Sequence, residues 1–253
     1  MDLQLENQNC VVIGGSRGIG RAIALGLAAE KANVAICGRN PESLQEAESE
    51  LARTGVKALS QTCDVSQPSQ LENFLTSVKD SFGSIDVLVH NASAIAVGPT
   101  LDDWEASIGV DLMAAVRASE QVIPWMEESG SGTILFVSSI SGIEASPAPD
   151  FGYTAAKAAL IAHAKKLAVM VAPRGIRVNA IAPGSTEFPG GVWDQVKQNA
   201  PPIYESVRAS IPWGRLATPE EIADVVVFLV SPRAAWVAGE CVSVDGAQHR
   251  GIR

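Results

Sequence analysis

The sequence predicts an α/β domain whose doubly wound, mostly parallel, seven-stranded sheet is covered by helices on both faces. Short and nearly continuous apolar runs alternate with longer amphipathic stretches, and strands that are apolar on both sides belong in a sheet with two covered faces. A glycine-rich turn also follows the first run directly. The runs that we expect to be strands are residues 10–13, 34–37, 58–63, 85–89, 133–137, 178–181 and 241–244.

Two helix starts have local support, because Asn40 and Thr218 each precede a proline and each can cap the free backbone N–H groups of a first turn. No linker, low-complexity tract or internal repeat interrupts the chain, so we expect a single domain over residues 1–253. One irregular region, residues 183–214, is rich in proline and aromatic residues and follows a predicted strand. Since open α/β sheets bind ligands at that edge, we expect a substrate lid at residues 185–212.

Composition narrows the class of partner. The chain has 19 Lys and Arg residues against 28 Asp and Glu residues, which gives a net charge of -9. Such a chain lacks the basic field that holds phosphates, and this argues against nucleic acids and anionic membranes. With no secretory signal layout and no apolar stretch long enough to cross a bilayer, we expect a cytoplasmic protein that binds a small molecule. The four scattered cysteines and three histidines have no metal-ligand spacing, so we expect no metal.

The glycine-rich turn at residues 14–20 reads Gly-Gly-Ser-Arg-Gly-Ile-Gly and leads into an apolar helix. Glycines let the backbone turn sharply and approach a pyrophosphate, whose charge the free N–H groups of a helix N-terminus stabilise. Its position at the first strand-to-helix turn of an alternating chain indicates a dinucleotide site rather than an ordinary turn. The residues that we expect to bind the cofactor here are Gly14, Ser16, Arg17, Gly18, Ile19 and Gly20.

The end of the second predicted strand indicates which dinucleotide binds. An NAD-binding chain of this architecture carries an acid there, about 20 residues beyond the glycines, to hold the ribose 2′-hydroxyl. Residues 37–40 read Cys-Gly-Arg-Asn and hold no carboxylate. Arg39, together with Arg17, is suited to clasp a 2′-phosphate through charge-assisted hydrogen bonds. We therefore expect NADP(H) rather than NAD(H).

Tyr153 and Lys157 lie four residues apart in a long helix-like stretch, so they project from one helix face. A fixed ammonium beside a phenol lowers the phenol's pKa toward the working range of an acid or base. Such a pair alone is weak evidence, because any amphipathic helix can hold one. Ser138 and Ser139, at the end of a predicted strand, add hydroxyls at the sheet edge where the cofactor also binds. A phenol, an ammonium and a hydroxyl then converge on one place.

Further short motifs follow in a specific order: Asp64-Val65, Asn91-Ala92, Pro183-Gly184 and Val244-Asp245-Gly246. With them the sequence resembles the short-chain dehydrogenase/reductase family over essentially its full length, especially its ketoacyl-carrier-protein-type reductases and alcohol dehydrogenases. The resemblance implies a Rossmann-like fold and a homotetramer. It implies that Tyr153 is the acid/base and that Lys157 holds the nicotinamide ribose. It also implies that Ser139, three residues before Gly142, hydrogen-bonds the reacting oxygen, with Ser141 as the second choice. The further cofactor-binding residues that it implies are Asp64, Val65, Asn91, Ala92, Tyr153, Lys157, Pro183, Gly184 and Thr186.

Two departures from the family's pattern bear on the chemistry. Asp111 stands where the family usually has an asparagine that supports a water-mediated proton relay to the lysine. We treat Asp111 as a catalytic candidate, with a structural acid in a bent helix as the equal alternative. Asp111→Asn is then predicted to retain or raise activity. Phe188 replaces a threonine, and we expect Thr186 to take over the contact with the carboxamide.

The sequence therefore predicts an oxidoreductase that transfers a hydride between NADP(H) and a carbonyl or secondary alcohol, namely an NADPH-dependent ketoreductase. Two alternatives stay open: an NAD-dependent alcohol, sugar or steroid dehydrogenase, and a dinucleotide-binding protein without catalysis. The substrate itself is not indicated, because each apolar residue near the site can equally be core or interface packing. The residues concerned are Ile95, Val97, Ile143, Phe188, Trp193 and Tyr204.

Overall fold

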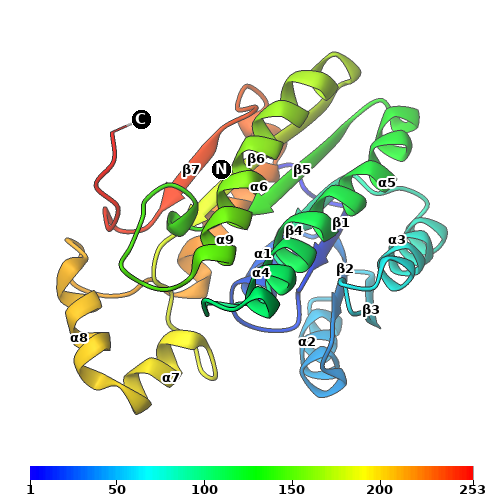
Figure 1. Cartoon of the computed structure of the whole chain (residues 1–253). Helices are drawn as coiled ribbons and strands as arrows, with labels where there is room; N and C mark the ends of the chain where they lie inside the picture. The colour runs from blue at the N-terminus through cyan, green and yellow to red at the C-terminus, as the bar shows by residue number, and fades with distance from the viewer. Residues whose placement is uncertain (253) are drawn as a thin grey trace.

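The computed structural model describes residues 1–252, and its centre is one seven-stranded sheet between two layers of helices (Figure 1). The strand order is β3-β2-β1-β4-β5-β6-β7, and every pairing is parallel. The expectation of a mostly parallel sheet is thus confirmed and sharpened. The strands are β1 (Asn9–Ile13), β2 (Asn33–Gly38), β3 (Ala58–Thr62), β4 (Val87–His90), β5 (Gly132–Val137), β6 (Ile176–Pro183) and β7 (Cys241–Val244).

The chain order of the strands creates a switch point beside β1. The chain runs outward through β2 and β3, then returns to pair β4 with the other side of β1. In open parallel sheets, ligands bind outside the carboxyl ends of strands where the order reverses in this way. Here Asn91, directly after β4, donates its side-chain Nδ2–H to the carbonyl oxygen of Gly14, directly after β1, at 2.9 Å. The two motifs predicted to bind a cofactor therefore meet at this edge.

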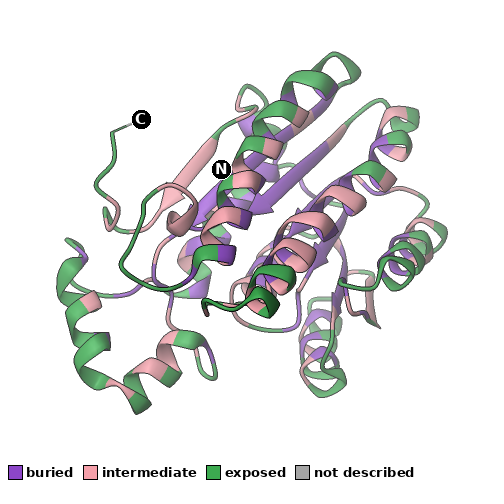
Figure 2. Cartoon of the chain, in the orientation of Figure 1, coloured by how far each residue is buried: buried purple, intermediate pink, exposed green. Residues whose placement is uncertain are grey.

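Helices α3, α5 and α6 cover one face of the sheet, and α1, α2 and α9 cover the other, so that the strands are buried between them (Figure 2).

The predicted caps are confirmed: Asn40 accepts a hydrogen bond from the Ser43 N–H, and Thr218 forms a reciprocal capping box with Glu221. No helix within residues 1–252 is long and apolar enough to cross a membrane. The helical segments are α1 (Gly18–Ala29), α2 (Pro41–Arg53), α3 (Pro68–Phe82), α4 (Leu101–Ser107), η1 (Ile108–Met113), α5 (Ala114–Ser129), η2 (Ile140–Gly142), α6 (Phe151–Val171), η3 (Ala172–Arg174), α7 (Val192–Asn199), α8 (Pro201–Ser210), α9 (Pro219–Val230) and η4 (Pro232–Ala234).

The irregular region predicted from residues 183–214 contains the helices α7 and α8, which project beyond the carboxyl edge of the sheet (yellow and orange in Figure 1). Tyr204 is buried there with Ile211 and Leu216, and Trp193 packs against the same cluster. The Tyr204 hydroxyl donates to Glu187 at 2.5 Å, and Lys197 donates to the same carboxylate at 2.6 Å. Tyr204 and Trp193 therefore pack within the α7–α8 pair itself.

Six of the seven strands differ from the sequence-based boundaries by one or two residues at an end, and two of them, β3 and β4, are shorter than expected. The run 58–63 ends as a strand at Thr62, and the run 85–89 is a strand only from Val87, but extends to His90. The reason at β4 is local, because the Asp86 carboxylate accepts from the Asn9 N–H at 2.7 Å and turns the chain into the sheet. His90 is thereby the last residue of a buried strand rather than the first residue of a loop.

Candidate active site

The glycine turn has the shape that a pyrophosphate requires. Gly14 and Gly18 have φ angles of 80° and 54°, a region that favours glycine. If residue 20 had a side chain, its Cβ would lie 2.1 Å from the Gly14 carbonyl oxygen, so only glycine fits there. The helix that follows the turn, α1, begins at Gly18, and no side chain within residues 1–252 caps its N-terminus. Its first N–H groups are therefore available to an anion, and the turn fits the phosphates of a dinucleotide.

The residues predicted to bind a 2′-phosphate lie at the end of β2 and in the turn before α1. Ser16 is buried, and its hydroxyl oxygen lies 2.7 Å from where a Cβ at Gly38 would be, so glycine is needed there. Arg17 and Arg39 are exposed, and within residues 1–252 neither forms an ion pair. Arg21, one turn further into α1, is instead occupied by Glu50 at 2.8 Å. Arg17, at the N-cap of α1, and Arg39, directly after β2, are thus both exposed and without an ion-pair partner among residues 1–252.

The remaining predicted cofactor residues also lie at the carboxyl edge of the sheet. Val65 is buried, and Asp64 accepts the Ser66 N–H. Gly184, after β6, approaches Asp245 so closely that a Cβ would lie 2.8 Å from it, which explains the pairing of the two late motifs. Thr186 is buried and donates its hydroxyl to the Gly184 carbonyl oxygen at 3.1 Å. Ala92 packs against Gly14, and Pro183 and Ile19 complete the set at the ends of β6 and α1.

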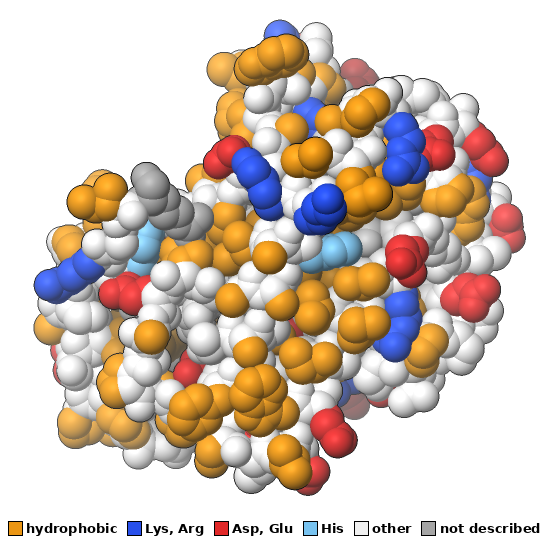
Figure 3. Space-filling view, turned by 45° about the horizontal axis from the view of Figure 1, so that its top comes forward, with side chains coloured by type: hydrophobic (Ala, Val, Ile, Leu, Met, Phe, Trp, Pro, Cys, Tyr) orange, Lys and Arg blue, Asp and Glu red, His pale blue; other side chains and the backbone are white. Residues whose placement is uncertain are grey.

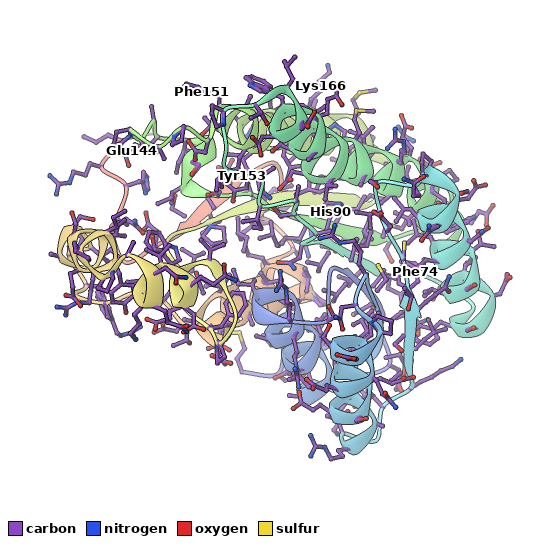
Figure 4. The ribbon with its side chains drawn as sticks, turned by 60° about the horizontal axis from the view of Figure 1, so that its bottom comes forward. Phe74, His90, Glu144, Phe151, Tyr153 and Lys166 are labelled. Carbon is purple, nitrogen blue, oxygen red and sulfur yellow. The ribbon has the colours of Figure 1, made fainter. Side chains whose placement is uncertain are left out.

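Tyr153 and Lys157 lie on α6 as predicted, with the lysine 2% exposed and its Nζ 5.5 Å from the centre of the tyrosine ring. Lys157 Nζ donates to the carbonyl oxygen of Val137 at 2.9 Å, and Ser138 Oγ donates to the carbonyl oxygen of Lys157 at 2.9 Å. The last residues of β5 are therefore tied to the first turns of α6. Figure 4 labels Phe151 at the outer edge of the molecule and Tyr153 nearer its centre.

Ser139 and Ser141 belong to one tight turn. Ser139 is buried, and its hydroxyl accepts the backbone N–H of Ser141 at 3.1 Å. The turn packs closely on α6, because a Cβ at Gly142 would lie 2.8 Å from the backbone of Lys157. The Ser139 hydroxyl is thus fixed at the end of β5, next to the helix that carries Tyr153. Ser141 stays the second candidate.

Asp111 contacts Lys157 directly. It lies in the π-helical segment η1, a rare form that often marks functional sites, and it is fully buried. Its Oδ1 lies 3.0 Å from Lys157 Nζ, and its Oδ2 accepts the Ala94 N–H at 3.0 Å. Burial lowers the pKa of Lys157, but the Asp111 carboxylate and then Tyr153 raise it, and the pKa ends above its usual value. The acid therefore holds the charged lysine without an intervening water.

His90 is a site residue that the sequence did not single out. It is fully buried at the end of β4, and neither ring nitrogen has a hydrogen-bond partner among residues 1–252. Burial, then the positive charge of Lys157, lowers its pKa to about 3, against the opposing effect of Asp111. The signal in the sequence is a histidine at the end of an apolar strand, directly before the Asn91-Ala92 motif.

Phe188 also has a definite place. Its ring packs against the glycine turn, within 2.5 Å of where a Cβ at Gly18 would lie, and against Gly191 at the start of α7.

Ile95 and Val97 are not part of the core, since both side chains are exposed in the loop after β4. Ile95 has a φ of 51°, which is strained for a β-branched residue. No cluster of three metal-ligating side chains occurs within residues 1–252.

Comparison with known proteins identifies the family of the chain. A family model described as enoyl-(acyl carrier protein) reductase matches residues 13–249. The chain belongs to the short-chain dehydrogenase/reductase family. It is similar to isoepoxydon dehydrogenase from Penicillium expansum, with 34% identity over 98% of this chain and 97% of that protein.

Two solved structures of this family resemble the chain closely and carry different cofactors. One is a 7α-hydroxysteroid dehydrogenase complexed with NADH and 7-oxo glycochenodeoxycholic acid, with a TM-score of 0.91, 28% identity, and coverage of 97% of this chain and 96% of that one. The other is a variant of actinorhodin polyketide ketoreductase with NADPH, with a TM-score of 0.89, 30% identity, and coverage of 96% and 97%. A nicotinamide dinucleotide is therefore the family's cofactor, and the choice between NAD and NADP is not decided by similarity.

We expect Asp111→Asn to retain activity, as predicted from the sequence, but with a displaced pH profile. The amide still accepts the Ala94 N–H, whereas the loss of the negative charge leaves the full positive field of Lys157 acting on Tyr153. The midpoint of kcat/KM for alcohol oxidation should fall by about one pH unit. Asp224→Asn, an exposed acid on α9, is the matched control. Complete loss of turnover would mean that the acid itself is required.

His90 also predicts a pH dependence of stability. Its folded pKa of about 3 lies below the ordinary 6.5, so between these values the unfolded chain binds the extra proton and stability falls as the pH falls. From pH 7 to pH 5 this histidine should lower the free energy of unfolding by about 2 kcal/mol. Urea denaturation at the two pH values measures the difference. His90→Phe should remove that part of the slope, and an unchanged slope would contradict the assignment.

Proposed function

We propose that the protein is an NADPH-dependent ketoreductase, which transfers a hydride between NADP(H) and a carbonyl or secondary alcohol. The observation that carries the proposal is the buried, ion-paired Lys157 beneath Tyr153 on α6, anchored to the end of β5 beside Ser139. Burying an ammonium is costly unless its partners are in place. A site that keeps such a charge next to a phenol is suited to acid/base chemistry.

Each residue then has one task. A bound nicotinamide dinucleotide supplies the hydride chemistry, and the glycine turn and the N-terminus of α1 hold its phosphates. In reduction, Tyr153 donates its phenolic proton to the carbonyl oxygen while Ser139 donates a hydrogen bond to the same oxygen. Lys157 stabilises the phenolate that results, because its charge lies on the same helix face. In oxidation the proton moves the other way.

The NADP(H) assignment rests on the end of β2. The absent carboxylate at residues 37–40, the small Gly38 and the two unpaired arginines favour a ribose that carries a 2′-phosphate. The second candidate is an NAD-dependent dehydrogenase. The structural similarity to the steroid dehydrogenase complexed with NADH supports this alternative. A binding protein without catalysis is disfavoured, since Ser139, Tyr153 and Lys157 are all present at one edge of the sheet.

The α7–α8 pair is our candidate for the substrate lid over residues 185–212, within a single domain of residues 1–253. Its position at the carboxyl edge and its own small core support a unit that moves as one body. Exposed Ile95 and Val97 favour an apolar or partly apolar carbonyl substrate.

The homotetramer and the cytoplasmic location stay predictions. Hydrophobic side chains are grouped on the outer surface in Figure 3, and exposed Trp236 and Met170 suit subunit contacts.

Tyr153→Phe tests the chemical assignment. Losing the general acid should lower kcat by about a hundredfold to ten-thousandfold, while NADPH still binds, because the glycine turn is untouched. The assay follows NADPH absorbance with a panel of ketones, ketoacyl thioesters, steroids and sugars, and calorimetry measures the binding. Unchanged turnover of every accepted substrate in Tyr153→Phe would refute the role of the phenol.

Arg39→Ala tests the cofactor assignment. Loss of a charge-assisted hydrogen bond to the 2′-phosphate should weaken NADP⁺ binding by about tenfold to a hundredfold, and leave the affinity for NAD⁺ unchanged. Arg53→Ala is the matched control, because Arg53 is an exposed arginine at the opposite end of α2 and pairs with Glu50. Equal affinities of the wild-type protein for NADP⁺ and NAD⁺ in titration calorimetry would show that the preference is wrong.

A further inference from the structure

Three of the four buried side-chain atoms that lack a hydrogen-bond partner within residues 1–252 lie in one place. They are Nδ1 and Nε2 of His90 and Oδ1 of Asp111; the fourth is Nε2 of His163. The Lys157 ammonium forms an ion pair with this Asp111 oxygen at 3.0 Å, and among the described residues Oδ1 has no hydrogen-bond donor of its own. An orphaned donor and an orphaned acceptor are therefore buried beside the same ion pair.

His90 faces the helix layer that holds the pair. It is in register with Phe136 of β5 and with Ile13 of β1, and both of these contribute to the core beneath α3, α5 and α6. Side chains in register on neighbouring parallel strands point to the same face of a sheet. The imidazole thus lies on the side of the sheet from which η1 presents Asp111 and α6 presents Lys157, and His90 is labelled in the interior in Figure 4.

The charges that act on His90 are those of Lys157 on α6 and Asp111 on η1. The other histidine on this face, His163, lies beyond Phe136, with its ring 5.5 Å from that of the phenylalanine. Burial and Lys157 keep His90 neutral at physiological pH, with a pKa of about 3. A neutral imidazole carries one N–H donor and one acceptor, so it can serve a carboxylate as a donor without adding a charge to the site.

We propose that His90 is a positioning residue for the Asp111–Lys157 pair, donating its N–H through one buried water to Oδ1 of Asp111. A carboxylate has about four lone-pair sites, and among residues 1–252 only the Ala94 N–H donates a hydrogen bond to one of them, while Lys157 pairs with Oδ1 through its charge. A buried water with two or more polar partners is an ordinary structural element, whereas a bare buried imidazole costs free energy.

The hydrogen bond has a consequence for Tyr153. A donor on Asp111 withdraws part of its negative charge, so the carboxylate offsets less of the Lys157 field. Without that donor, Asp111 neutralises Lys157 more fully, and the tyrosine is a weaker acid. This effect rests on the proposed function of Tyr153, and it has the opposite sign to the effect of Asp111→Asn.

The test compares His90→Phe and His90→Asn with wild type in two measurements. One is the pH midpoint of kcat/KM for alcohol oxidation. The other is the pH midpoint of tyrosinate absorbance, to which only two side chains contribute because the chain has two tyrosines. Tyr204 titrates later, since the hydrogen bond to Glu187 raises its pKa. His90→Phe should raise both midpoints by about one pH unit, with the NADP⁺ affinity changed less than about twofold. His90→Asn, which keeps an N–H donor, should restore them.

Two controls separate positioning from packing. His163→Phe removes the second histidine of this helix layer, which is partly buried. This substitution should move neither midpoint. In an Asp111→Asn background, His90→Phe should move neither midpoint further, because the carboxylate charge on which the His90 N–H acts is gone. Midpoints of His90→Phe that match those of wild type, or an equal shift from His163→Phe or in the Asp111→Asn background, would overturn the proposal.

Failure of the proposed function gives a different result. If wild type turns over no carbonyl or alcohol with either dinucleotide, the ketoreductase proposal fails, but tyrosinate absorbance still decides the role of His90. If His90→Phe does not fold, nitrogen NMR of the wild-type imidazole takes its place. One neutral, hydrogen-bonded N–H that shifts in Asp111→Asn supports the proposal, and an N–H that is insensitive to that substitution overturns it.

Discussion

An ammonium group that leaves water for a protein interior loses several kcal/mol of solvation, and it stays charged only where oxygen atoms replace the water. Lys157 meets this condition through Asp111 and the Val137 carbonyl oxygen. Each partner comes from a different element, so the ion pair couples η1, the end of β5 and α6. The geometry around Tyr153 depends on this coupling, because the same helix turn carries both side chains.

The parallel sheet explains why the parts of the site converge. All strands end at one edge, so residues far apart in the chain, such as Gly14, Asn91 and Ser139, come to lie along it. The π-helical turn of η1 rotates Asp111 inward to meet the lysine, and the turn at Ser139 packs against α6 at Gly142. The helices α7 and α8 extend from the same edge, where we propose the substrate lid.

Much of this could be predicted from the sequence, because apolar strands, proline-capped helices and a glycine turn are local patterns with local causes. The seven strands, the caps at Asn40 and Thr218 and the shared face of Tyr153 and Lys157 follow from such patterns. The direct Asp111–Lys157 contact and the buried His90 do not, since they depend on how three elements pack across the sheet. Phe188 against Gly18 is likewise a contact between segments some 170 residues apart, which periodicity cannot reveal.

The central claim is that Lys157 is a buried, charged ammonium held by Asp111, with a pKa above its ordinary value. Nitrogen NMR of lysine-labelled protein, with the Lys157 signal assigned by its loss in Lys157→Met, measures this charge directly. The account predicts an ammonium signal that persists to a higher pH than those of the exposed lysines, and that titrates earlier in Asp111→Asn. A neutral Lys157 amine at physiological pH would contradict it.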